Sequence, residues 1–289
     1  MKVSVPASTA NLGPGFDHLA AALSLRLELR SVDGDGWTYV HKGPGQPKAP
    51  PDDKLVRRAI DAVIGEPAGV GLEMTSSIPV GYGLGSSGAA TVAGLLLGYA
   101  IRGDDPDPIE LLLLGAGLEG HPDNIAASFY GGLVNVVGTV SGWEVMRFDP
   151  ASSVRPLILL PQKGLSTQKA RGVLPKDVPL DDAVANSSRA SGLLAMLNGS
   201  AESTAARLWE FTSEVIHQPS RAGLMKATTK ALHQLREKGI AAAVSGAGPS
   251  IVCFALKGEE TRVKSEAKEL AGWELLDVTW DVDGARILK

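Results

Sequence analysis

The chain has 289 residues, of which 44% are hydrophobic and 21% charged, and its formal net charge is −4. This length suits one large or two medium domains, and the acidic balance argues against a nucleic-acid-binding surface, which needs clustered positive charge. The single cysteine, Cys253, lies in an apolar run, so we expect a buried thiol and no disulfide, as in a reducing compartment. Apolar runs stay well short of the roughly 18 residues that cross a membrane, and the first residues do not resemble a signal peptide. We therefore expect a cytoplasmic protein without membrane contact.

Strand patterns open the first half of the chain and helical patterns follow them. Alternating or β-branched runs predict strands at residues 2–5, 25–31, 37–41 and 70–75, and a hairpin from 131–140 and 143–148. Apolar periodicity predicts helices at residues 53–64, 87–101 and 108–118. A connector rich in Pro and Gly occupies residues 43–51.

Residues 149–153 read as a linker, so we predict an N-terminal domain at 1–150 and a C-terminal α+β domain at 151–289. The second half predicts strands at 154–160, 240–244, 251–255, 273–278 and 282–288. It predicts helices at 167–172, 180–198, 201–215, 220–238 and 260–271. Strands and helices do not alternate strictly, which favours an α+β fold over a doubly wound sheet.

The glycine-dense segment 79–91, Pro-Val-Gly-Tyr-Gly-Leu-Gly-Ser-Ser-Gly-Ala-Ala-Thr, runs into a helix of small residues. Glycines at 81, 83 and 85 allow positive φ and a close approach to an anion, while the free N–H groups of the helix start face it. The helix dipole adds about 0.3–1 kcal/mol for negative charge there. Ser86 and Ser87 supply hydroxyls for phosphate oxygens or a magnesium ion. The segment predicts a phosphate-binding turn.

The same letters match the dinucleotide fingerprint G-x-G-x-x-G at residues 83–88, so other interpretations have to be weighed. A dinucleotide turn directly follows its strand, whereas five residues separate the strand at 70–75 from the glycines here. A Walker A loop carries Lys after its last Gly, where this chain has Ser86. A glycine-rich helix cap without a ligand remains an alternative, because Gly is common at helix ends.

Residues 5–18 place Asn11 and Asp17 in a predicted loop that holds Pro14 between Gly13 and Gly15. A carboxylate beside a carboxamide suits an ammonium or hydroxyl group of a small polar ligand. Both residue types also form turns by themselves, so a purely structural role stays open.

Residues 119–124, Glu-Gly-His-Pro-Asp-Asn, cluster polar groups at the end of an apolar helix. Glu119 could ligate magnesium and Asn124 could orient a nucleophile. The alternative is a C-cap followed by an N-cap, with His121 as a capping or packing residue. Zinc is not favoured, because no third ligand accompanies the Glu and His.

Two arginines stand in distinctive segments, Arg171 in 166–171 and Arg221 in 217–221. The planar guanidinium matches a carboxylate with two parallel hydrogen bonds, although most arginines are solvated surface residues. Residues 245–250, Ser-Gly-Ala-Gly-Pro-Ser, interrupt two strand patterns and either form a plain hairpin loop or approach a ligand closely.

Together these motifs resemble the superfamily of galactokinase, homoserine kinase, mevalonate kinase and phosphomevalonate kinase, the GHMP kinases. Residues 79–90 are similar to its ATP-binding motif P-x-x-x-G-L-G-S-S-x-A, and residues 245–251 to its third motif. Segments 5–17, 119–124, 166–171 and 217–221 most resemble those of the homoserine kinases. The resemblance extends from residue 3 to about residue 255. Gly88 departs from the usual Ala, and the leucines at 111–114 replace the upstream metal-binding Glu of relatives with a longer loop, leaving Glu119 as the nearby candidate.

The resemblance implies a two-domain α+β kinase that binds ATP, Mg²⁺ and L-homoserine between its domains. Its ATP-binding residues would be Pro79, Gly81, Gly83, Leu84, Gly85, Ser86, Ser87, Gly88 and Ala89. Ser87 and Glu119 would bind the metal, and the loop Gly246, Ala247, Gly248 would close on the substrate side. Asn11 and Asp17 would hold the amino and hydroxyl end of the acceptor, Arg171 and Arg221 its carboxylate, and His121 and Asn124 would line the pocket near the reacting oxygen. A homodimer is compatible with the sequence.

The implied reaction is in-line transfer of the ATP γ-phosphoryl group to the homoserine hydroxyl, giving O-phosphohomoserine for threonine synthesis. Such a transfer needs position and charge neutralisation more than a base. Related kinases that use a base carry Asp where Asn124 falls, so we expect no strong base. The alternatives are a sister kinase for mevalonate, a phosphorylated isoprenoid or a sugar, a catalytically silent binding protein of the same fold, and a dinucleotide-dependent oxidoreductase.

Overall fold

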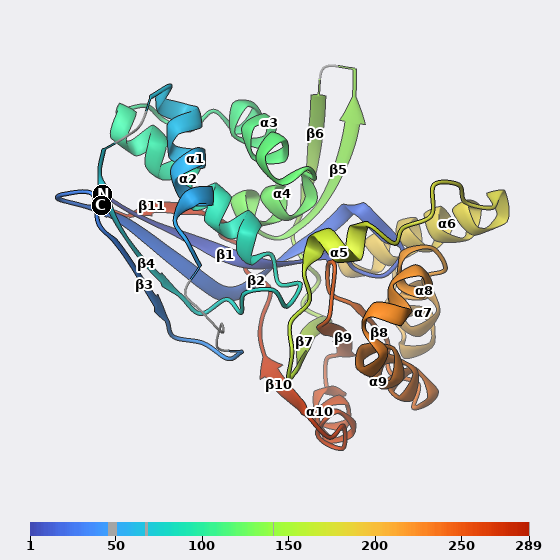
Figure 1. Ribbon diagram of the computed structural model, residues 1–289. Coiled ribbons are helices and arrows are strands. Elements are labelled where there is room, and N and C mark those ends of the chain that lie inside the picture. Colours follow the sequence, from blue (N-terminus) through green and yellow to red (C-terminus); the bar gives the residue numbers. More distant parts are fainter. Residues whose placement is uncertain (46–50, 67–68, 141, 289) are drawn as a thin grey trace.

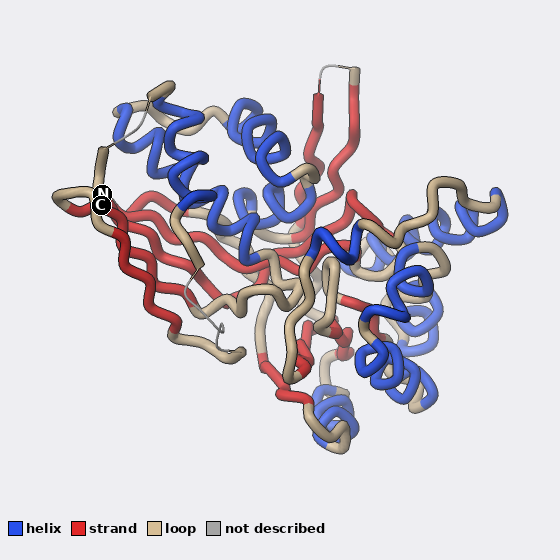
Figure 2. The backbone as a smooth tube through the Cα atoms, in the orientation of Figure 1, coloured by secondary structure: helices blue, strands red, loops and turns tan. Residues whose placement is uncertain are grey.

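A seven-stranded sheet carries the first part of the chain in the computed structural model, which describes residues 1–45, 51–66, 69–140 and 142–288 (Figures 1 and 2). Its main path runs β11 (Arg286–Leu288), β1 (Lys2–Asn11), β2 (Gly15–Val32), β4 (Gly71–Ser76) and β3 (Trp37–His41). Strand β2 also pairs with β5 (Leu133–Thr139), which continues into the hairpin with β6 (Gly142–Phe148). These pairings are antiparallel except for β3 with β4.

Four helices lie together over one face of this sheet (Figure 1). They are α1 (Lys54–Ile64), α2 (Ser86–Arg102), α3 (Pro108–Glu119) and α4 (Asp123–Tyr130). Helix α2 packs closely against α1, because a Cβ atom at Gly94 would lie 2.7 Å from the Cβ of Ala59. The small residues of α2 therefore bring the glycine turn at its start close to the sheet.

A second, four-stranded antiparallel sheet carries most of the remaining chain, in the order β10 (Trp273–Asp277), β7 (Val154–Pro161), β9 (Ile251–Leu256) and β8 (Ala242–Val244). The helical elements there are α5 (Thr167–Arg171), α6 (Leu180–Leu197), α7 (Ala205–Phe211), α8 (His217–Arg221), the short 3₁₀ turn η1 (Ala222–Leu224), α9 (Lys226–Glu237) and α10 (Glu260–Lys268). The predicted α+β class is confirmed. Within the described ranges, none of the helices is both long and apolar enough to cross a bilayer.

The predicted division after residue 150 falls between β6 and β7, which belong to different sheets. The last strand departs from this division, because β11 returns to the first sheet and pairs antiparallel with β1. The two-domain boundary remains a proposal, with β11 now placed on the N-terminal side.

Several predicted elements have different bounds in the structure. Residues 5–18 are not a loop, because β1 continues to Asn11 and β2 already begins at Gly15. Small buried residues from Ala7 to Ala10 pair with β2, and only Thr9 among them is β-branched, so the stretch has little of the character that predicts a strand. The helix predicted at 220–238 is interrupted at Met225, where φ is −134° and ψ is 57°. The strand predicted at 282–288 keeps only its last three residues, and the predicted connector at 43–51 lies partly outside the described residues.

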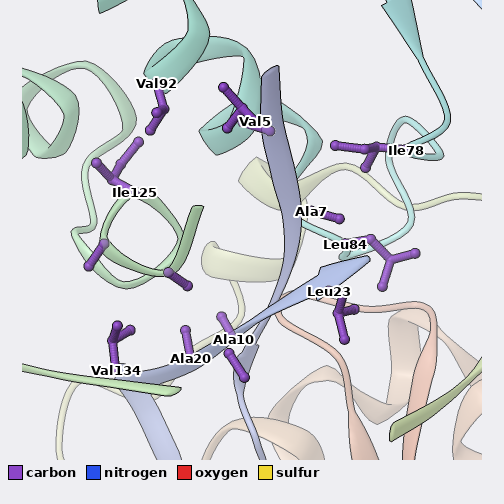
Figure 3. Close-up of a cluster of buried hydrophobic side chains, with 14 of the residues drawn as sticks. Val5, Ala7, Ala10, Ala20, Leu23, Ile78, Leu84, Val92, Ile125 and Val134 are labelled. Carbon is purple, nitrogen blue, oxygen red and sulfur yellow. The ribbon is translucent and has the colours of Figure 1, made fainter. Parts of the chain in front are cut away.

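The larger hydrophobic core joins the sheet, the helices and the glycine turn. Figure 3 shows Val5 of β1, Val92 of α2, Ile125 of α4 and Val134 of β5 in this cluster, together with Leu84. Leu84 is 1% exposed, so the middle of the glycine turn is anchored in the core. The turn is consequently held by packing as well as by its own backbone.

Candidate active site

A cleft of about 150 Å³ lies where the glycine turn, the turn between β1 and β2, and the starts of α4 and α5 meet the loop after β8. Its walls include the six predicted acceptor-side residues: Asn11, Asp17, His121, Asn124, Arg171 and Arg221. They also include Gly81, Gly83, Leu84, Gly85, Ser86, Ser87, Gly246 and Ala247. The predicted residues Pro79, Gly88, Ala89, Glu119 and Gly248 stand outside this lining.

The glycine turn leaves its amides available to a ligand. Gly81, Gly83 and Gly85 have φ of 80°, 75° and 66°. Among the described residues, no backbone hydrogen bond takes up the N–H groups of residues 83–88. These amides lie just before and within the first turn of the 17-residue helix α2, whose dipole favours negative charge at this end. The geometry therefore suits an anion with several oxygens, such as a phosphate chain.

Two glycines of the turn are required by close approach. A Cβ at Gly85 would lie 2.0 Å from Ser8 Oγ, and one at Gly83 would lie 2.2 Å from the carbonyl oxygen of Ser245. The loop after β8 also contacts Gly83, because the Ser245 hydroxyl donates a hydrogen bond to the Gly83 carbonyl oxygen at 2.7 Å. The second glycine-rich segment thus packs directly on the first.

Ser87 and Glu119 bring two oxygen ligands together at the start of α2. The Ser87 hydroxyl donates to Glu119 Oε2 at 2.6 Å, and Thr91 donates to Glu119 Oε1 at 2.9 Å. In the part of the chain that the structure describes, no group of three or more His, Cys, Asp or Glu side chains could hold a metal ion. A cation here would take its other ligands from water and a bound anion, which is how Mg²⁺ is commonly held.

The turn between β1 and β2 adopts strained backbone at residues other than glycine. Asn11, Leu12 and Asp17 have φ of 68°, 49° and 60°. Such conformations cost about 1–2 kcal/mol each and persist where the surroundings hold them. Asn11 provides part of that hold, because its Nδ2 donates to the Gly246 carbonyl at 2.8 Å and its Oδ1 accepts from the Asp17 amide at 3.1 Å. Both polar atoms of Asn11 are therefore engaged within the protein.

Asp17 and Arg171 form a half-exposed ion pair at the cleft. Arg171 donates from Nη2 to Asp17 Oδ1 at 2.7 Å and from Nη1 to Oδ2 at 3.1 Å. Both side chains retain about a third of their exposure, 35% and 33%. The pair is accessible to a charged ligand that offers each side chain an alternative partner.

Arg221 is buried and carries charge without a carboxylate partner. It is 1% exposed and makes no ion pair among the described residues. Its hydrogen bonds go to neutral acceptors: the carbonyls of Ala170 and Gly246 at 3.0 and 3.3 Å, and His217 Nδ1 at 3.2 Å. Burial and the nearby charge of Arg171 lower its pKa. A buried guanidinium of this kind favours an incoming anion, because desolvated charge is costly without a counter-charge.

His121, Asp123 and Asn124 form a hydrogen-bonded group at the start of α4. His121 Nδ1 donates to Asp123 Oδ1 at 2.9 Å, and Asn124 Oδ1 accepts from Ser8 Oγ at 2.9 Å. Burial alone would lower the pKa of His121, but the hydrogen bond and charge of Asp123 outweigh it, so the pKa is raised. Asp123, the first residue of α4, also accepts the backbone N–H of Asn124 at 2.8 Å, so one carboxylate holds both His121 and the start of the helix beside the cleft.

Sequence reasoning missed five lining residues: Ala10, Phe16, Val80, Thr167, and Asp123 as a partner of His121. The Phe16 ring centre lies 5.8 Å from Arg171 Cζ and 5.4 Å from Arg221 Cζ, so one aromatic ring lies within cation–π distance of both cations. The available signal for Phe16 was a large apolar side chain in the short polar segment Gly-Phe-Asp, because such a segment has no hydrophobic core in which a phenylalanine would be buried.

Comparison with known proteins places these features in a family. The model of the GHMP kinases N terminal domain matches residues 54–132, and that of the GHMP kinases C terminal matches residues 185–271. The homoserine kinase of Streptomyces avermitilis is 36% identical over 100% of this chain and 95% of its own length. That of Leifsonia xyli is 39% identical over 99% and 91%.

Solved structures show the same similarity. The crystal structure of homoserine kinase from Cytophaga hutchinsonii has a TM-score of 0.79 and 26% identity, covering 100% of this chain and 97% of its own. The Streptococcus pneumoniae phosphomevalonate kinase, solved with phosphomevalonate and AMPPNP, has a TM-score of 0.71 and 17% identity over 97% and 99%, which shows a shared fold.

Proposed function

Because this chain belongs to the homoserine kinases of the GHMP kinase family, we propose that its cleft holds ATP at the glycine turn and L-homoserine beside Arg221. It is an ATP-dependent kinase that phosphorylates the side-chain hydroxyl of homoserine, a step toward threonine. The site assignment rests on one observation. A single cleft combines backbone amides at the start of α2 that make no backbone hydrogen bond among the described residues with Arg221, a buried arginine that has no carboxylate partner there.

The amides of residues 83–88 would hold the phosphate chain, and Arg221 would hold the acceptor carboxylate. Asp17 would accept hydrogen bonds from the substrate ammonium group. Arg171 would turn away from Asp17 and bind the substrate carboxylate together with Arg221. Asn11 would position Asp17 and Gly246, since its own polar atoms are already engaged. A zwitterion would therefore replace the internal ion pair, which explains why Asp17 and two arginines meet in one cleft.

The reacting hydroxyl would lie near His121 and Asn124, between the two bound groups. Asn124 has neither a carboxylate nor a basic nitrogen, so it can orient the hydroxyl group but cannot act as a general base that removes its proton. Holding both reactants in line is worth up to about 7–11 kcal/mol, and a loose phosphoryl-transfer state asks little of a base. Protonated His121 would add positive charge beside the transferring group.

The family implies magnesium, and the oxygens at the start of α2 fit it. Ser87 Oγ and Glu119 Oε2 would bind the ion beside the phosphate amides. When bound, Mg²⁺ neutralises charge on the phosphate oxygens. A cytoplasmic location and a homodimer remain predictions.

A coupled assay of ADP release tests the proposal, with L-homoserine, mevalonate, phosphomevalonate and galactose as acceptors. We expect strong turnover with L-homoserine alone and dependence on Mg²⁺. Equal or faster turnover with another acceptor would reject the assignment of the pocket to a zwitterion. NADH fluorescence in the same samples should show no binding, which separates this function from the oxidoreductase alternative.

A further inference from the structure

His217 stands between the two sides of the proposed acceptor pocket. It begins α8 and is fully buried, with 0% of its surface exposed. Its Nδ1 accepts a hydrogen bond from Arg221 Nη1 at 3.2 Å, and its Nε2 lies 2.9 Å from the carbonyl oxygen of Gly13 in the turn between β1 and β2. One imidazole therefore connects the buried arginine to the turn that precedes Asp17 at the start of β2.

The partners fix the form of this imidazole. A guanidinium can only donate, so Nδ1 must present a lone pair, and a carbonyl can only accept, so Nε2 must carry the proton. Only the neutral imidazole with its proton on Nε2 makes both hydrogen bonds. The charged form would place an N–H against Arg221.

The charged groups around His217 support the same form. Glu214, Arg221 and Asp17 are the ionisable side chains that act on it, and burial is the largest influence and lowers its pKa. Glu214 Oε2 is 3.9 Å from Nε2, but its carboxylate already accepts the backbone N–H groups of His217 and Gln218, both at 2.7 Å. Glu214 consequently fixes the start of α8 rather than taking the imidazole proton.

Phe16 closes the arrangement from the side of the turn. Its ring centre lies 5.2 Å from that of His217, with 33° between the planes, and 5.4 Å from Arg221 Cζ. The turn is also packed tightly against the end of α7, because a Cβ at Gly13 would lie 2.6 Å from the carbonyl oxygen of Thr212, the residue that follows that helix. The distance between Arg221 and the turn is thus defined by the size of one imidazole.

We propose that His217 is a positioning residue for the amino-acid acceptor, holding Arg221 and the β1–β2 turn at the separation that a zwitterion spans. It does not touch the substrate and acts through its two neighbours. The inference rests on the proposed acceptor site at Arg221 and Asp17, and it adds a buried residue whose effect is confined to acceptor binding.

Steady-state kinetics with four variants tests this role. His217→Leu removes both hydrogen bonds at similar volume, and His217→Gln keeps one acceptor and one donor at a similar spacing. His233→Leu is the matched control, because His233 is exposed and forms a surface pair with Glu237, outside the cleft. We expect His217→Leu to raise the KM for homoserine about 10- to 100-fold and the KM for ATP less than about threefold. His217→Gln should recover most of the loss, and His233→Leu should match the wild type.

Arg221→Lys, measured in parallel, separates the inference from the function on which it rests. If Arg221→Lys leaves the KM for homoserine unchanged, the proposed acceptor site is wrong and the role of His217 fails with it. If Arg221→Lys raises that KM but His217→Leu does not, the acceptor site stands and the positioning role alone is rejected. Equal increases in both KM values for His217→Leu would also reject it.

A measurement on the wild-type protein decides the matter even if His217→Leu does not fold. Nitrogen NMR of ¹⁵N-histidine protein, with His217→Gln to assign the resonance, should show protonated Nε2, unprotonated Nδ1 and no titration between about pH 6 and 8. Protonated Nδ1, or titration in that range, would contradict the proposed positioning.

Discussion

Asp17 and Arg171 are 154 positions apart in the chain, yet they share two hydrogen bonds, of 2.7 and 3.1 Å, at the mouth of the cleft. These two charged side chains of the pocket therefore satisfy one another, whereas Arg221 bonds to neutral acceptors. Partly exposed pairs of this kind are stabilising by no more than about 1 kcal/mol, so a zwitterion can replace the contact at little cost.

Replacing Asp17 with Asn removes the proposed partner of the substrate ammonium while keeping the shape of the side chain. We expect Asp17→Asn to raise the KM for homoserine about 10- to 100-fold and the KM for ATP far less, because hydrogen bonds to charged groups are strong. Glu28→Gln, a change on the same strand at a surface pair with Lys2, is the control. An unchanged homoserine KM would remove Asp17 from the acceptor pocket.

Glu119 provides a test of the proposed metal site. Glu119→Gln keeps an acceptor for the Ser87 hydroxyl but removes the negative charge, so the Mg²⁺ concentration for half-maximal rate should rise about tenfold. Glu110→Gln changes a glutamate on the same helix, bonded to Tyr99, and should leave this concentration unaltered. Equal Mg²⁺ dependence of the two variants would exclude Glu119 as a ligand.

The backbone of the glycine turn was predictable because its geometry is local in the chain. Positive φ at Gly83 and Gly85, and a helix that begins at Ser86, one residue before its predicted start, follow from residue type and order. The strand at Ala7–Ala10 was missed because only Thr9 among these four residues favours a strand, and here the pairing with β2 decides the structure.

The acceptor side was only partly predictable, because it depends on contacts between distant segments. Residue types indicated that Arg221 could bind a carboxylate, but not that it is 1% exposed and bonded to neutral acceptors. The use of both polar atoms of Asn11 within the protein depends on Gly246, which lies 235 positions away. Both features depend on packing between distant segments of the chain, which sequence patterns do not show.

Gly85 tests the phosphate turn through backbone geometry alone. A methyl group there meets Ser8 Oγ at 2.0 Å and requires φ of +66°, so Gly85→Ala should lower the free energy of unfolding by about 1–3 kcal/mol and raise the KM for ATP. Gly117→Ala, inside α3 with no heavy atom within 4 Å of the new Cβ, should instead stabilise by up to about 1 kcal/mol. Chemical denaturation and ATP kinetics on both variants check the contrast. Similar stability of the two would argue against a tightly packed turn.

His121 predicts a dependence of stability on pH with a defined sign. Asp123 raises the pKa of folded His121 against the opposing effect of burial, so the folded state binds the proton more tightly than the unfolded state. The resulting stabilisation is fully present below the unfolded pKa, about 6.5, and is lost as the pH rises through the higher folded pKa.

We therefore expect the difference in Tm between wild type and His121→Gln to be largest near pH 5.5 and to shrink toward about pH 8.5. In an Asp123→Asn background the same His121→Gln change should lose this pH dependence, because the raised pKa requires the carboxylate. Thermal unfolding of the four proteins at matched ionic strength measures both effects. A Tm difference that grows with pH would mean that burial dominates and that His121 is neutral in the folded protein, which would remove its proposed positive charge from phosphoryl transfer.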